Sequence, residues 1–427
     1  MARNIGWLLG GRGFTGAASL AYLALAARAL GPQGFGTFSL ILAYGAGIAN
    51  LIQFRSWQAV IRFGAIHHGA ERRDQLHRLF GFTATLDWTS ALLGAVVAVF
   101  GTALAAPLLG WSSIEARDAA LFGAVLLLST GATPAGILRL GDRFDLLTYT
   151  EAIGPLIRLV GALVAWTAGL GINVFLMVWA TAAIAQMLVG WAAALIIHRA
   201  RLTLGRTAFR QTLAENPRLW RFMVQTNLSS SLSAIWQQLG VLAVGAVDGA
   251  VSAGAFRIAS KLASSFSKPL ETMTRVLYPE LARLVASNDH ATLRRVFLQL
   301  TAVSTVMAAL VIGLAVFAGP RLLVLFSGHG FEGAYPYLIV LTIAAAIDLA
   351  GFGLESIHNA HGRSGRVLGA RLIGAVTYVF ALALLLPTIG PIGAAFAVVA
   401  TSLAMRLHMA MSAKRILQRK GGEMEES

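Results

Sequence analysis

Twelve long apolar runs dominate the 427-residue sequence and limit the folds that the chain can adopt. Each run holds about 20 residues, the length that an α-helix needs to cross the hydrocarbon core of a bilayer. The strands of a membrane barrel would instead alternate over segments of about 10 residues. Only 12% of the residues are charged, whereas roughly a quarter are charged in soluble globular proteins. We therefore predict an all-α integral membrane protein with 12 transmembrane helices.

The runs fall into two sets of six. The expected spans are roughly Ile5–Ala27, Gly36–Val60, Leu79–Leu104, Ala119–Leu138, Leu147–Ala168, Ile172–Ile197, Phe222–Ala246, Val251–Arg275, Val296–Ala318, Tyr335–Glu355, Val367–Leu386 and Pro391–Met411. The longest basic connection, His198–Arg221, separates the two sets and contains Glu215-Asn216-Pro217, a helix-breaking triplet. We expect an N-terminal six-helix lobe at 1–200, a cytoplasmic linker at 201–221, a C-terminal six-helix lobe at 222–412 and a cytoplasmic tail at 413–427.

The basic residues are distributed unevenly between the two sides of these spans. With a cytoplasmic N-terminus, 25 of the 34 Lys and Arg residues fall on the cytoplasmic side, and three, Arg28, Arg117 and Arg321, fall on the other. Lys and Arg accumulate in cytoplasmic loops, so both termini are expected inside the cell. This topology also accounts for most of the net charge of +15 without a nucleic-acid partner.

Two short motifs recur between the halves and indicate an internal duplication. Gly31-xxxx-Gly36-x-Phe38 returns 218 residues later as Gly249-xxxx-Gly254-x-Phe256, in the corresponding connection. Arg158-Leu-Val-Gly-Ala returns 213 residues later as Arg371-Leu-Ile-Gly-Ala, in the corresponding span. Many transporters are built from two such repeats.

Six basic residues remain deep within the expected spans, where a charged side chain facing lipid is costly and often marks a cavity or a substrate path. In the eighth span, three of them are spaced by four and seven residues and therefore share one helical face. The six are Arg12, Arg55, Arg158, Arg257, Lys261 and Lys268. Two other interpretations stay open: the eighth span could lie flat on the membrane surface, and the first three arginines could extend toward the headgroups.

A cavity with more cations than carboxylates favours an anionic ligand. Diphosphate is a good candidate, because Arg binds phosphate in a bidentate manner and Lys supplies a point charge. The candidate substrate-binding residues are Arg12, Arg55, Gln238, Arg257, Lys261 and Lys268. Two carboxylates within spans, Asp87 and Asp348, are candidates for coupling a proton or sodium ion, with a structural role as the favoured alternative.

The sequence has no cysteine, and it lacks GxSxG, Walker and HExxH motifs. We therefore expect neither an enzyme nor a metal or cofactor site. An enzyme that polymerises or transfers glycans would need catalytic residues in a sizeable outer loop. The longest outer connection, Gly319–Ala334, offers only Arg321, His329 and Glu332.

Three segments resemble the polysaccharide and oligosaccharide-lipid flippases of the multidrug, oligosaccharidyl-lipid and polysaccharide exporter superfamily. They are Ala-Arg-Ala-Leu-Gly-Pro-xx-Phe-Gly at 27–36, Gly-Ala-Phe-Arg-Ile-Ala-Ser-Lys-Leu at 254–262 with Leu-Tyr-Pro-Glu-Leu at 277–281, and Gly-Pro-Ile-Gly-Ala-Ala at 390–395. With the twelve-span plan, the resemblance covers essentially the whole chain. A departure is the short C-terminal tail, since the lipid II flippases have two further spans.

The resemblance implies two six-helix lobes around a central, cationic cavity. It implies transport of a polyprenyl-diphosphate-linked oligosaccharide across the bacterial inner membrane by alternating access, for lipopolysaccharide, O-antigen or exopolysaccharide biosynthesis. Membrane lipids surround such a protein, and a polysaccharide polymerase and glycosyltransferases are candidate partners. The alternative within the superfamily is a multidrug cation antiporter, whose cavity should carry acidic groups instead.

The cysteine-free chain allows a clean test of topology. We expect Ser427→Cys and Ala208→Cys to be protected from an impermeant thiol reagent in intact cells and to react after the membrane is opened, because both positions should be cytoplasmic. Labelling in intact cells would contradict this orientation. Arg117→Cys, in an expected outer connection, should react without permeabilisation.

Overall fold

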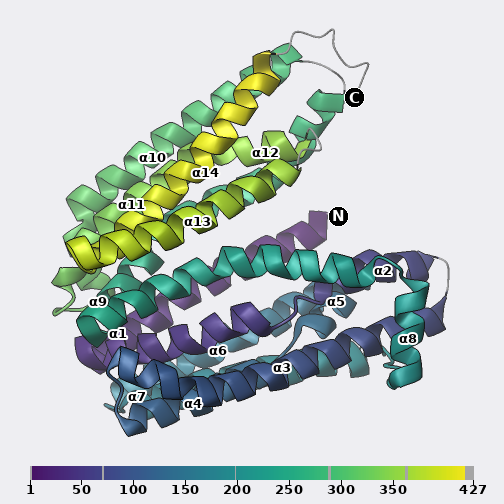
Figure 1. Ribbon diagram of the computed structural model, residues 1–427, viewed down its shortest axis with the longest axis horizontal. Coiled ribbons are helices and arrows are strands. Elements are labelled where there is room, and N and C mark those ends of the chain that lie inside the picture. The colour runs from purple at the N-terminus through teal and green to yellow at the C-terminus, as the bar shows by residue number, and fades with distance from the viewer. Residues whose placement is uncertain (1, 70–71, 198, 287–289, 361–363, 419–427) are drawn as a thin grey trace. The chain divides into compact units, whose positions relative to one another are not determined.

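The computed structural model describes residues 2–69, 72–197, 199–286, 290–360 and 364–418 (Figure 1). Within these ranges the chain is helical and contains no strand. It forms two compact units, Met1–Gly254 and Ala255–Ser427. The predicted all-α fold is therefore confirmed.

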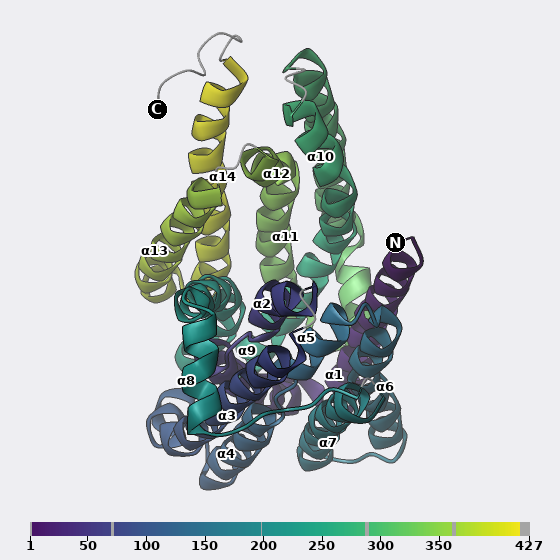
Figure 2. The same ribbon diagram turned by 90° about the vertical axis from the view of Figure 1, so that its right-hand side faces the viewer.

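The first unit contains eight α-helices and the first part of a ninth. They are α1 (Ala2–Ile52), α2 (Trp57–Gly69), α3 (Arg73–Leu109), α4 (Ser113–Leu128), α5 (Ala132–Leu140), α6 (Phe144–Thr167), α7 (Ile172–Ala192), α8 (Arg206–Glu215) and the start of α9 (Leu219–Ala286). Within this unit α3 packs along α4, α1 packs on α4 and α6, and α2 packs on α5 (Figures 1 and 2). A π-helical turn, Ala193–Ile197, extends α7.

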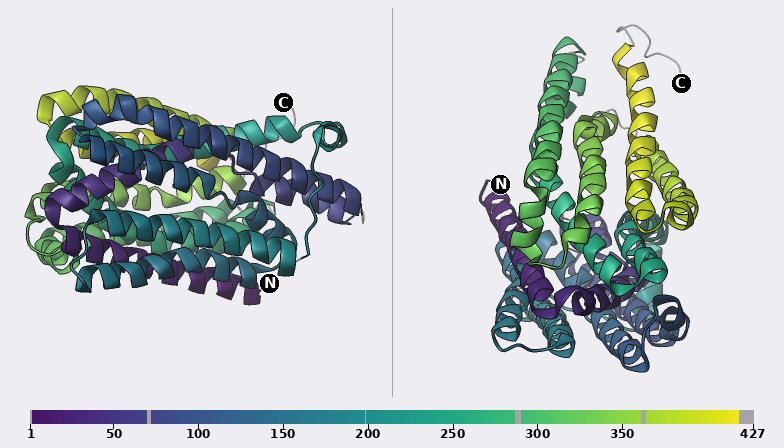
Figure 3. Two further views of the ribbon diagram at one scale, coloured as in Figure 1. Left: turned by 90° about the horizontal axis from the view of Figure 1, so that it is seen from below. Right: turned by 90° about the vertical axis from the view of Figure 1, so that its left-hand side faces the viewer.

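The second unit contains the end of α9 and five further α-helices. They are α10 (His290–Ser327), α11 (Tyr335–Ala350), α12 (Phe352–Ala360), α13 (Ser364–Ile389) and α14 (Ile392–Gln418), with a 3₁₀ turn at Glu332–Ala334. Within this unit α13 and α14 lie along each other, and α11 packs on both α10 and α14 (Figures 2 and 3).

Ten helical segments of the described chain are long and apolar enough to cross a membrane. The predicted number of 12 is approximate, because α1 and α9 each run through two expected spans. Gly31 (φ 63°) and Gly249 (φ 80°) bend these helices at the expected connections. Both φ values lie in the left-handed region, which residues with a Cβ rarely adopt.

Three expected spans are interrupted, which the apolar pattern did not reveal. Residues 53–56 separate α1 from α2, residues 129–131 separate α4 from α5, and Gly351 separates α11 from α12. The expected 201–221 linker is also more ordered than a simple connection, since it contains α8. The boundary signal Glu215-Asn216-Pro217 does lie between two helices, α8 and α9.

The helix lengths repeat between the two halves. Helices α4 and α11 each have 16 residues, and the helices that follow them, α5 and α12, each have nine. The preceding helices α3 and α10 have 37 and 38 residues. The predicted duplication therefore extends from short motifs to the order and length of the helices.

The two glycine motifs meet inside the first unit. A Cβ added at Gly36 would overlap the backbone carbonyl of Ala250, and one added at Gly254 would lie 3.0 Å from the Cα of Gly36. The absence of a side chain at both positions lets the two backbones approach closely. The repeated glycines thus hold the first-to-second and seventh-to-eighth connections together.

We expect Gly36→Ala to destabilise the protein by about 1–3 kcal/mol, because the added methyl group has no room. Gly313→Ala in α10 is the matched control, since its Cβ would meet nothing within 4 Å. There the substitution should stabilise the helix by up to about 1 kcal/mol. Thermal unfolding in detergent measures both, and an unchanged unfolding temperature for Gly36→Ala would contradict the close approach.

Candidate functional site

The interruptions at residues 53–56 and 129–131 expose backbone groups that must find partners, since the bilayer core offers no water to hydrogen-bond them. Polar side chains distant in sequence supply several of these partners. Gln53 Nε2 donates to the carbonyl of Leu127 over 2.8 Å. Trp191 Nε1 donates to the carbonyl of Thr130 over 3.2 Å. The two interruptions are therefore fixed by specific polar contacts.

Asp87 holds the start of α5. Its side chain is fully buried, and Oδ2 accepts hydrogen bonds from the backbone N–H of Thr133 at 2.8 Å and from Thr133 Oγ1 at 2.7 Å. Gly131 precedes α5 and has no side chain to cap it, so a carboxylate from α3 performs this role. The positive end of the helix dipole favours a negative charge at this position. Ser56 Oγ lies 3.3 Å from Thr133 Oγ1 and extends the contact to the start of α2.

Arg55 lies in the first interruption, with an exposed side chain. Its backbone N–H donates to Asn227 Oδ1 over 2.7 Å, which links the interruption to α9. Arg55 lines a cavity of about 250 Å³ whose walls come from both interruptions. The other lining residues are Ala49, Asn50, Gln53, Phe54, Ser129, Thr130, Gly131 and Ala132. Arg55 therefore lies beside a polar cavity at the two helix interruptions.

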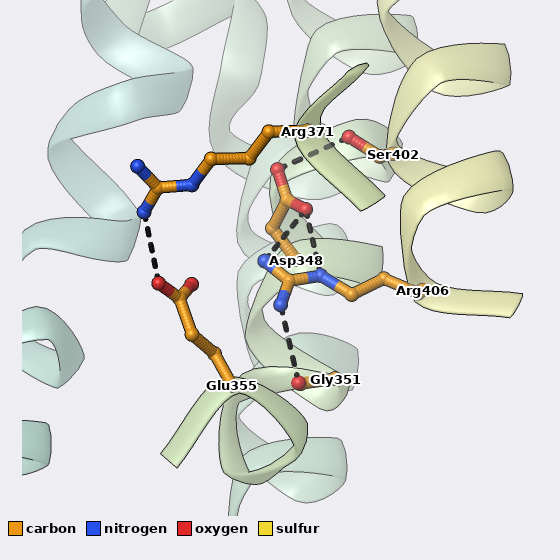
Figure 4. A network of polar contacts seen from close by, with 6 residues as sticks. All are labelled: Asp348, Gly351, Glu355, Arg371, Ser402 and Arg406. Atoms are coloured by element: carbon orange, nitrogen blue, oxygen red, sulfur yellow. Dashed lines mark hydrogen bonds and ion pairs between the residues drawn. The ribbon is translucent and has the colours of Figure 1, made fainter. Parts of the chain in front are cut away.

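The third interruption, in the second unit, carries a network of ion pairs (Figure 4). Asp348 Oδ1 accepts hydrogen bonds from Arg406 Nε at 3.0 Å and from Nη2 at 2.9 Å, and Oδ2 accepts one from Ser402 Oγ at 3.1 Å. Arg406 Nη1 also donates to the carbonyl of Gly351 at 3.2 Å, at the end of α11. Glu355 pairs with Arg371 at 2.8 Å. Asp348 thus pairs with an arginine that also donates a hydrogen bond to the backbone carbonyl at the end of α11.

The remaining predicted binding residues are distributed over both units. Gln238 belongs to the first unit, and Arg257 and Lys261 belong to the second; all three side chains are partly buried on α9. Arg257 and Lys261 form what we call the cationic stripe on α9. Beside it, Ser264 Oγ and Ser265 Oγ donate to the carbonyl of Lys261 at 3.0 and 2.7 Å. The side chains of Arg12 and Lys268 lie outside the described residues.

Comparison with known proteins identifies the family. A model of the polysaccharide biosynthesis protein family matches residues 1–285. The chain belongs to this family. The inner membrane protein YghQ of Escherichia coli K12 is 29% identical over 290 residues, which cover 66% of this chain and 80% of that protein.

Two solved structures share the fold of this family member at low sequence identity. The lipid II flippase MurJ in an inward closed conformation has a TM-score of 0.71 and 16% identity, covering 95% of this chain and 86% of MurJ. An inward-facing multidrug resistance MATE family transporter of the MOP superfamily has a TM-score of 0.69 and 15% identity, covering 97% and 95% of the two chains. The predicted likeness to polysaccharide biosynthesis proteins is confirmed by the family match, and the two structures show the shared fold.

The partners of the charged residues were not evident from the sequence. Ser129-Thr130-Gly131 is a local turn signal that could have revealed the break in the fourth span. Nothing local pairs Asp87 with Thr133, or Asp348 with Arg406, which lie 46 and 58 residues apart. Both carboxylates have structural contacts in the folded chain.

We expect Asp87→Asn to lower the unfolding temperature while transport persists, because an ionised carboxylate at a helix N-terminus contributes up to about 2 kcal/mol. Asp74→Asn is the control, since Asp74 occupies the first turn of α3 but is exposed. Asp87→Asn combined with Thr133→Val should cost less than the sum of the single changes, because both remove the same contact. Unchanged stability together with loss of dependence on an ion gradient would instead assign Asp87 to ion coupling.

Proposed function

We propose that this protein is a flippase that moves a polyprenyl-diphosphate-linked oligosaccharide across the bacterial inner membrane by alternating access, for cell-surface polysaccharide biosynthesis. The observation that carries the proposal is the position of Arg55 beside a polar cavity at two broken helices, in a member of a polysaccharide biosynthesis family. Irregular backbone within the membrane is tolerated where it lines such a cavity.

The chemistry of the candidate residues fits a diphosphate. Arg55 and Arg257 can each present a planar guanidinium to two phosphate oxygens, and Lys261 adds a compact charge. Arg257 and Lys261 are four residues apart on α9 and therefore share a helical face. Gln238 carries a side-chain amide, which can both donate to and accept from sugar hydroxyls.

A multidrug cation antiporter is the second candidate, favoured by the MATE structures that share the fold. The charges argue against it. Of the two carboxylates that the sequence indicates as candidates for proton or sodium coupling, Asp87 caps a helix and Asp348 pairs with Arg406. A cationic drug would therefore compete with contacts that stabilise the fold.

We propose that the protein acts as a transporter and has no catalytic activity. It places the protein in the inner membrane with both termini in the cytoplasm, among membrane lipids and without a nucleic-acid partner. A polysaccharide polymerase and glycosyltransferases are the proposed partners, because a lipid-linked oligosaccharide must be made before transport and used after it.

Proteoliposomes with a polyprenyl-diphosphate-linked oligosaccharide in one leaflet test the proposal directly. Wild-type protein should bring the glycan to the other leaflet, where an added glycosidase can cleave it. The Arg257→Leu, Lys261→Leu double variant should lose most of this activity, and Arg257→Lys should retain part of it, because a point charge replaces a bidentate group.

Arg117→Gln is the control for loss of a cation, because the Arg117 side chain is 65% exposed next to Asp118. It should transport at the wild-type rate. Export of a cationic dye without movement of the oligosaccharide would favour the antiporter. Normal glycan movement by a well-folded double variant would remove the stripe on α9 from the mechanism.

A further inference from the structure

Another cavity of the first unit lies between α8 and α3, with a volume of about 270 Å³. Phe82 and Phe209 form its apolar wall, and their ring centroids lie 4.5 Å apart. As far as the described residues form the wall, it carries one charged side chain, that of Arg206, which is exposed. Whole small-molecule ligands fill about 300–1,000 Å³. The size therefore fits a part of a larger, amphipathic ligand.

Helix α8 lies across the end of α3 in both views of the ribbon (Figures 1 and 2). Because α3 is long and apolar enough to cross a membrane, α8 runs along the membrane surface. Phe209 and Leu213 of α8 pack against the buried cluster that contains Phe82. Arg206 and Arg210 are four residues apart on α8 and are exposed. The protein itself thus covers the apolar face of α8, and the arginines are held at the level of the lipid headgroups.

An exposed apolar face of α3 leads away from the cavity. Trp88, Leu92, Val96 and Val99 follow Thr85, which lines the cavity, at spacings of three or four residues. These spacings place them on one side of the helix, and all four are exposed. From Thr85 to Val99 the helix rises by about 21 Å. That is more than one leaflet's half of the roughly 30 Å hydrocarbon core, so this face can accompany a lipid chain through its leaflet.

The charge around the cavity favours an anionic lipid headgroup. Residues 199–221 contain six arginines and one acidic residue, Glu215, which is paired with Arg78. Basic residues at this depth are attracted to anionic headgroups. A zwitterionic headgroup gains less, since it carries a cation of its own. The six arginines, all exposed, are Arg199, Arg201, Arg206, Arg210, Arg218 and Arg221.

We propose that this cavity binds one anionic phospholipid of the surrounding leaflet. Its phosphate lies at Arg206, its glycerol region enters the cavity, and one acyl chain follows the exposed face of α3. The leaflet is the cytoplasmic one in the proposed topology. The site shares no lining residue with the cavity beside Arg55, and its lipid is a resident partner that holds α8 at the bilayer surface.

Native mass spectrometry of the full-length protein in detergent measures this binding. The probes are phosphatidylglycerol and phosphatidylcholine with identical acyl chains, so that the two differ in headgroup charge. The wild type should bind phosphatidylglycerol at least about tenfold more tightly, because its headgroup is anionic and unopposed.

Two matched pairs of variants locate the site. Arg206→Gln should weaken binding of phosphatidylglycerol about fivefold, since one cation beside the phosphate is lost. Arg210→Gln, one turn further along α8 and outside the cavity wall, should have little effect. Thr85→Trp fills the cavity and should weaken binding at least about tenfold. Thr89→Trp, at an exposed position one turn further along α3, should leave it unchanged.

Three results would each overturn the proposal: equal affinity for the two lipids, equal effects of the two arginine variants, or full binding by Thr85→Trp. Tighter binding of a polyprenyl diphosphate than of phosphatidylglycerol, lost in Thr85→Trp, would also overturn it, by assigning the cavity to the transported substrate. Unfolding temperatures verify that the variants fold, and the threonine pair decides the result if Arg206→Gln does not. Because the assay involves no transport, its failure leaves the proposed flippase activity standing.

Discussion

The fold depends on satisfying backbone hydrogen bonds where helices are broken inside an apolar environment. Each free N–H or C=O in the bilayer core costs several kcal/mol, so an interruption persists only when side chains cover it. Asp87 provides this at the start of α5, and Arg406 provides it at the end of α11. These contacts stabilise the helix interruptions, so that polar cavities can lie beside them.

The sequence predicted the features that depend on local pattern. Apolar length predicted the helices, and Glu215-Asn216-Pro217 predicted a helix boundary. The repeated glycine motifs indicated a duplication and lie at the connections where Gly31 and Gly249 bend the chain. The apolar pattern did not reveal the interruptions, because one to four residues within an apolar run change its mean hydropathy little. Pairs such as Asp348 with Arg406 depend on packing between helices distant in sequence, which single-sequence patterns do not encode.

The two halves illustrate how a duplicated scaffold diverges in charge while its geometry is retained. Both keep a 16-residue helix followed by a nine-residue helix, and both keep the arginine of the following span. In each half an ion pair joins the nine-residue helix to the helix that follows it, Arg139–Glu151 in the first and Glu355–Arg371 in the second. The acid of this pair lies on the longer helix in the first half and on the nine-residue helix in the second.

The bends at Gly31 and Gly249 also bear on how the chain enters the membrane during synthesis. Each bend joins two apolar segments within a single helical element and leaves no polar loop between them. Two such segments can partition into lipid together as a hairpin, so almost no hydrophilic chain has to be translocated with them. A glycine with a positive φ at each bend therefore shortens the segment that the insertion machinery must carry across the bilayer.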